Sequence, residues 1–101
     1  MITIKAPETF RAKVTIPVPG GAEVSFVGVF RHRSRTELHE WVQAKGRTDE
    51  QTIMDCLAGW EGVDAEFNAA SVALLLEQYH AAPRVIVEAY VDELMQARLG
   101  N

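Results

Sequence analysis

Apolar and polar residues alternate along two stretches in the first third of the chain. The first has apolar residues at Phe10, Ala12, Val14 and Ile16 with polar residues between them, and the second has Val24, Phe26, Gly28 and Phe30 on one face and Ser25, Val27, Val29 and Arg31 on the other. A period of two is typical of a half-buried strand. The Pro17–Gly21 connection has the residues of a tight turn, since proline presets φ and glycine supplies a positive φ. The pattern therefore predicts an antiparallel β-hairpin.

An isolated hairpin is marginal in water, so its apolar face must pack on other elements. The opposite face carries Val27 and Val29, which indicates that this face is also covered, by a helix or by another subunit.

After the hairpin the apolar positions change to a helical period. Ser34 to Glu37 fits a capping box, S-x-x-E, and predicts a first helix that runs to about Lys45 before Gly46. Thr48 to Gln51 is a second box, T-x-x-Q, and predicts a second helix that carries Ile53, Met54 and Leu57 inward and stops at Gly59.

Two further helices are expected in the second half. Asn68 suits the N-cap of a third helix to about His80, with an apolar stripe at Val72, Leu75, Leu76 and Tyr79. Pro83 fits the first turn of a fourth helix that ends at Gly100. The expected fold is α+β in a single domain over residues 1–101, with a flexible arm (1–9), an N-terminal antiparallel β-hairpin (10–33) and a helical region of about four α-helices (34–99).

The net charge of −4 divides unevenly along the chain. Residues 1–47 carry eight Lys or Arg and four Glu (+4), whereas residues 48–101 carry two Arg and ten Asp or Glu (−8). Attraction between the halves within one chain is one interpretation, and head-to-tail self-association or docking on a charged partner is the other. The acidic second half disfavours a nucleic-acid-binding module, which is usually basic.

No pattern of catalytic or metal-binding residues stands out. The three histidines share no helical spacing, and Cys56 is the single cysteine, with the acidic Asp55 beside it, which favours an inert thiol. Phosphate-loop, dinucleotide-binding and serine-nucleophile motifs are missing, so we expect no enzyme and no cofactor. No signal peptide or membrane-spanning run is recognisable, which favours a reducing cytoplasm and no membrane partner.

The aromatic and basic positions leave alternatives open. Trp41 falls on a core stripe, whereas Trp60, in a predicted turn between Gly59 and Gly62, either plugs the core or is an exposed binding anchor. The run Arg31 to Arg35 is either a solvated strand end that pairs with acidic helices or a phosphate-binding patch. No aromatic residues interleave with it to stack bases, which disfavours nucleic acid.

Taken together, these patterns resemble the tail assembly chaperones of long-tailed bacteriophages and prophages. The resemblance covers about residues 10–98 and rests on Phe10, Val14 to Gly21, Phe30 to Arg33 with Ser34 to Glu37, Gly59-Trp60, Val63-Asp64, Phe67-Asn68, the Val72 to Tyr79 stripe and the Tyr90 to Arg98 helix. The hairpin-then-helices order is also similar to this family.

The resemblance implies a non-enzymatic protein that binds the tape measure protein and keeps it soluble while the tail is built. It implies action in the host bacterial cytoplasm and absence from the mature virion. Family members often also occur as a longer frameshifted form that recruits tail tube protein, and a homo-oligomer is a further possibility. The alternatives are a minor structural component of a phage tail and a small bacterial adaptor protein.

The hypothesis for the binding surface is the second face of the hairpin. Its apolar part is Val27 and Val29, its border is Arg31, Arg33 and Arg35, and Trp60 is a further candidate contact. A long helical partner exposes apolar stripes that need cover until assembly buries them.

Overall fold

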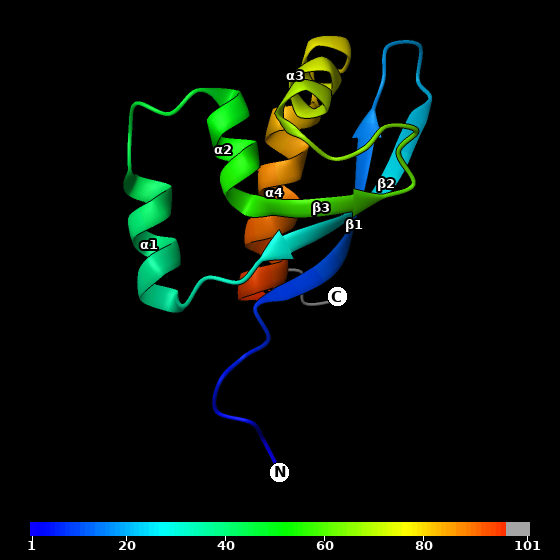
Figure 1. Cartoon of the computed structure of the whole chain (residues 1–101). Helices are drawn as coiled ribbons and strands as arrows, with labels where there is room; N and C mark the ends of the chain where they lie inside the picture. Colours follow the sequence, from blue (N-terminus) through cyan, green and yellow to red (C-terminus); the bar gives the residue numbers. More distant parts are fainter. Residues whose placement is uncertain (97–101) are drawn as a thin grey trace.

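The computed structural model describes residues 1–96, and the predicted hairpin is present (Figure 1). Strands β1 (Thr9–Pro17) and β2 (Glu23–Arg31) pair antiparallel, with Phe10 opposite Phe30 and Val14 opposite Phe26. Gly20 and Gly21 have φ values of 96° and 91°, which few other residues adopt, so the turn forms as the Pro/Gly run predicts. Residues 1–8 extend away from the body of the protein (Figure 1).

A third strand lies where the sequence predicted the end of a helix and a turn. Helix α2 (Asp49–Cys56) ends at Cys56, and β3 (Leu57–Glu61) pairs antiparallel with β2, giving the order β1-β2-β3. The prediction that Leu57 to Gly59 is helical was therefore wrong. The segment gains backbone pairing with β2 and full burial of Leu57 opposite Phe30, which outweighs a further half-turn of helix.

The prediction that Trp60 lies in a turn is wrong, because Trp60 lies on β3. It pairs with Gly28 of β2, and a register shift between Val29 and Phe30 realigns the two strands. Gly28 is required here because a Cβ at this position would come within 2.7 Å of the Phe30 ring and 3.0 Å of Leu57. The absence of a side chain at Gly28 therefore leaves room for the buried Phe30 and Leu57 side chains.

The four predicted helices are present, and their starts follow the predicted caps. Ser34 precedes α1 (Arg35–Gln43): its hydroxyl accepts from the Glu37 N–H at 3.2 Å, and the Glu37 carboxylate accepts from the Ser34 N–H at 2.9 Å. Thr48 and Gln51 make the same reciprocal pair at α2. Both capping boxes are therefore confirmed.

The last two helices are α3 (Ala69–Gln78) and α4 (Ala82–Met95). Asn68 caps α3 by accepting from the Ser71 N–H at 2.8 Å, and Pro83 lies in the first turn of α4, both as predicted. The predicted stop at Gly100 lies outside the described residues.

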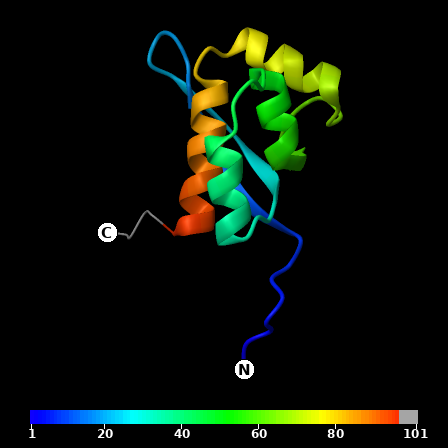
Figure 2. The same ribbon diagram turned by 90° about the vertical axis from the view of Figure 1, so that its left-hand side faces the viewer.

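The core lies between the inner face of the sheet and the helices. Helix α4 packs on β1, and α2 packs against α3, α4 and β3 (Figures 1 and 2). The Tyr90 side chain of α4 is fully buried, stacks on Phe30 with centroids 5.3 Å apart, and meets Trp41 edge-on at 5.4 Å. Helix α1 is the outermost layer, held to the core chiefly through Leu38 and Trp41.

Candidate partner-binding surfaces

The outer face of the sheet is the first surface the sequence pointed to. Val27 and Val29 lie on it, half-buried, with Arg31 exposed at the end of the same strand. The outward residues of β1, among them Arg11, Lys13 and Thr15, are all exposed, so none of the described helices covers this face. A helix or another subunit was expected to cover this face, and no helix of residues 1–96 does so.

An ion pair spans this face above the two valines. Arg11 of β1 and Glu61 of β3 lie 2.9 Å apart, and they pair in register with Val29 and Val27 respectively. Because β2 runs between β1 and β3, the two side chains must pass over its outer side. Their side chains are 66% and 52% exposed, so this pair adds little stability and a partner can displace it at small cost.

Arg33 points away from that face. Its guanidinium lies 4.8 Å from the centroid of the Trp41 ring, and it donates to the Tyr90 hydroxyl at 2.8 Å and to the Asp55 carbonyl at 3.2 Å. Tyr90 in turn donates to the carbonyl of Arg31 at 2.7 Å. Arg33 is therefore half-buried and joins the end of β2 to α1, α2 and α4.

A second arginine also packs on the Trp41 ring. Arg47 stacks on the same ring at 4.5 Å, donates to the Trp41 carbonyl at 2.6 Å and lies 3.9 Å from the Asp55 carboxylate. The prediction that Trp41 is a core residue is confirmed, with 8% of it exposed. Arg47–Asp55 and Arg11–Glu61 both join the basic and acidic halves, so the charge asymmetry is partly used within one chain.

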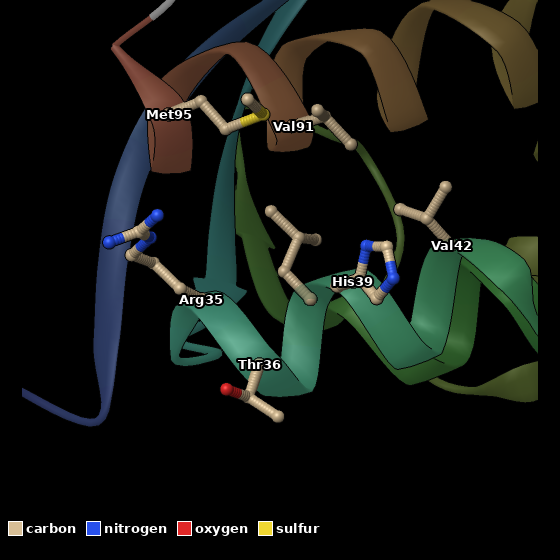
Figure 3. A pocket seen from close by; sticks show the side chains of 7 residues that line it. Arg35, Thr36, His39, Val42, Val91 and Met95 are labelled. Atoms are coloured by element: carbon tan, nitrogen blue, oxygen red, sulfur yellow. The ribbon is translucent and has the colours of Figure 1, made fainter.

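Arg35 lies on a different surface, a groove between α1 and α4 (Figure 3). The groove has a volume of about 690 Å³ and is lined by Arg35, Thr36, Leu38, His39 and Val42 from α1 and by Val91 and Met95 from α4. Leu38, Trp41 and Val42 have the i, i+3, i+4 spacing of one helix face, but Val42 is 55% exposed at the groove edge. Leu38 and Trp41 of α1 belong to the core cluster, whereas Val42 lies outside it.

Trp60 is partly buried and packs against the core. Its ring meets Phe26 and Phe67 edge-on at 6.0 Å and 5.2 Å, and its Nε1 donates to the carbonyl of Ala65 at 2.8 Å. These contacts favour the core interpretation of Trp60 over the exposed anchor. The structure thus brings together Val27, Val29 and Arg31, and it separates them from Arg33, Arg35 and Trp60.

Two ionisable side chains of the described core have raised pKa values. Burial raises the pKa of the Cys56 thiol to about 12, and burial also raises the pKa of Tyr90. A neutral, fully buried thiol is a poor nucleophile. Within residues 1–96 no group of three or more His, Cys, Asp or Glu side chains is placed to hold a metal ion. None of the described helices is long and apolar enough to cross a membrane.

The described residues form a small α+β domain with an uncovered outer sheet face and a groove between α1 and α4. Residues 1–101 match the family model described as phage tail assembly chaperone. The chain therefore belongs to the phage tail assembly chaperone family, and the resemblance found in the sequence is confirmed. No curated protein and no solved structure matches the chain.

Proposed function

We propose that this tail assembly chaperone binds the tape measure protein and keeps it soluble until tail tube subunits surround it. The observation that carries this proposal is the uncovered outer face of the sheet. Val27 and Val29 lie there beside Arg31, under an exposed ion pair, and no described helix covers them. A long helical protein with exposed apolar stripes needs such a removable cover before assembly.

The contact surface is centred on Val27 and Val29, with Arg31 at its edge. Arg33 supports this edge from inside, since the Arg31 carbonyl accepts from Tyr90, which also binds Arg33. Arg35 and Trp60 lie on other surfaces and act, in this proposal, outside this contact.

The remaining features of the proposal concern where and how the protein acts. It works without catalysis in the cytoplasm of the host bacterium and is released before the virion matures. Copies associate along one tape measure chain, and a longer frameshifted form brings tail tube protein to the same complex. Mass spectrometry of purified particles tests the release, because a structural tail component would be present in them and a released chaperone would not.

The direct test of the surface is co-purification of the tape measure protein with variants of this chain. Replacing Val27 and Val29 with aspartate should abolish co-purification, because two charges would have to be buried in the contact. Leu74→Asp, at a side chain 60% exposed on α3, is the matched control and should bind as wild type.

Circular dichroism must show that the double variant is folded. Should the aspartates unfold the sheet, threonine at both positions keeps the β-branched shape, replaces one methyl group of each valine with a hydroxyl and should weaken the contact. A folded double variant that still recovers the tape measure protein in full would show that this face is not the contact surface.

A further inference from the structure

The groove between α1 and α4 is a further apolar surface that no other described element covers, and it is hollow where the sheet face is open. Its floor is Leu38, which is only 7% exposed, and its edges are Val42 and Met95, which are 55% and 63% exposed. Figure 3 shows Val42 rising from α1 at one end of the groove, Val91 pointing down from α4, and Met95 lying along α4 at the other end. Two of the large apolar side chains that the described chain exposes thus line one hollow.

Both walls of the groove are helical ridges. On α1 the lining residues Arg35, Leu38, His39 and Val42 follow the i, i+3, i+4, i+7 spacing of one helix face, and on α4 Val91 and Met95 are one turn apart. Ridges of this spacing interdigitate with the side chains of another helix. Helix α1 spans about 13 Å at 1.5 Å per residue, so about two turns of a third helix would fill the length of the groove.

The polar side chains on the α1 wall indicate which kind of helix the groove would bind. Arg35 and His39 stand on this wall, and the lining residues include no carboxylate. Neither side chain has a hydrogen bond or ion pair with another residue of the described chain, whereas Arg33 and Arg47 are both engaged. An occupant with carboxylates on the flank beside α1 would supply the missing partners.

We propose that this groove binds an amphipathic helix of the tape measure protein, with Asp or Glu along one edge of its apolar stripe. The apolar side chains of that helix pack on Leu38, Val42 and Met95, and its acidic edge lies along Arg35 and His39. This inference rests on the proposed function for the identity of the partner, but the groove is separate from the face that carries Val27 and Val29. One copy of the chain then holds its partner through two surfaces.

The test is a methyl NMR titration of the full chain with overlapping peptides from the tape measure protein. Peptides with an acid-edged apolar stripe should shift the signals of Val42, Val91 and Met95 and leave that of Leu74 unmoved. Peptides in which those acids are replaced by lysine should bind about tenfold more weakly, the size expected for a lost close charge pair. Arg35→Glu should reverse this order and favour the lysine peptides.

Variants at the groove edge test the same surface, both by their affinity for the peptides and by co-purification of the tape measure protein. Val42→Asp and Met95→Asp replace exposed side chains and should leave the fold intact, yet each should lower the affinity for the acid-edged peptides about tenfold or more. Leu74→Asp, which replaces a side chain of similar exposure on α3, should bind as wild type.

The outcomes separate this inference from the proposed function. Should the wild-type chain recover the tape measure protein, and both groove variants recover it equally well, the groove proposal is wrong and the proposed function stands. Should the wild-type chain recover nothing, the proposed function fails. If the NMR signals of Val42, Val91 and Met95 shift when the chain alone is concentrated, the occupant of the groove is a second copy of the chain, and the proposal is overturned.

Discussion

Replacing Tyr90 with phenylalanine tests how the helical layer is held to the sheet. The ring would keep its place among Phe30 and Trp41, because those contacts involve carbon atoms only. What disappears is the hydroxyl, which donates to the Arg31 carbonyl at 2.7 Å and accepts from the Arg33 guanidinium at 2.8 Å. The substitution therefore isolates two hydrogen bonds from the packing of the core.

The expected loss of stability follows from those two bonds. A neutral hydrogen bond contributes about 1 kcal/mol and one to a charged group about 1.5–3 kcal/mol. Arg33 is half-buried and keeps its bond to the Asp55 carbonyl and its stacking on Trp41, so water and these contacts offset part of the loss. We expect the free energy of unfolding to fall by about 2–3 kcal/mol, which corresponds to roughly 10–20 °C in melting temperature for a domain of this size.

Urea unfolding followed by tryptophan fluorescence measures this change. The midpoint should fall while the slope m stays constant, because the surface exposed on unfolding is the same. A double-mutant cycle with Arg33→Met should show a coupling energy of about 1 kcal/mol or more, since the two side chains are in direct contact. A loss below about 0.5 kcal/mol for Tyr90→Phe would refute the view that this hydroxyl joins β2 to α4.

Three further predictions concern single positions. Gly28→Ala should destabilise by about 1–3 kcal/mol in urea unfolding, because its Cβ would meet the buried Phe30 ring at 2.7 Å, whereas Gly59→Ala, with its nearest contact at 3.9 Å, should cost much less. Ser34→Ala should lower the free energy of unfolding by about 1 kcal/mol through loss of the cap of α1. The pKa of Cys56 is about 12 in the folded chain against 9.0 for a free thiol, so its contribution to stability is complete below pH 9 and is lost as the pH rises toward 12. The free energy of unfolding should therefore fall by about 1.4 kcal/mol between about pH 8 and about pH 10, and this fall should be missing in Cys56→Ala.

Each of these predictions has a result that contradicts it. Equal stability of the two glycine variants would mean that the sheet tolerates a side chain at Gly28. A Ser34→Ala protein as stable as wild type would mean that the reciprocal cap adds nothing to α1. The same alkaline fall in the Cys56→Ala protein would assign the pH dependence to another group.

Most of the secondary structure was readable from the sequence because its signals are local. The hairpin follows from a period of two and a Pro/Gly turn, and the helix starts follow from hydroxyl and amide caps at Ser34, Thr48 and Asn68. Strand β3 was missed because five residues show too few alternations, and because its pairing with β2 joins segments far apart in the sequence. Leu57 therefore continued the apolar stripe of α2 in the prediction although it lies on the sheet.

The sequence predicted the candidate surfaces only in part. Alternation was sufficient to place Val27, Val29 and Arg31 on one face. It could not show that Arg33 turns inward to Tyr90, since that contact spans 57 residues. The groove between α1 and α4 also depends on how two distant helices pack, and its only local signal was that α1 carries Val42 in addition to the two apolar residues the core accepts, Leu38 and Trp41.

Co-expression with the tape measure protein of the same phage tests the central claim most directly. The measured quantity is the soluble yield of that protein with and without this chain. We expect the tape measure protein to be recovered as a soluble complex only when the two are expressed together, and we expect Val27→Asp with Val29→Asp to remove this recovery. A tape measure protein that stays insoluble, with nothing bound to the folded wild-type chain, would show that this protein does not keep the tape measure protein soluble.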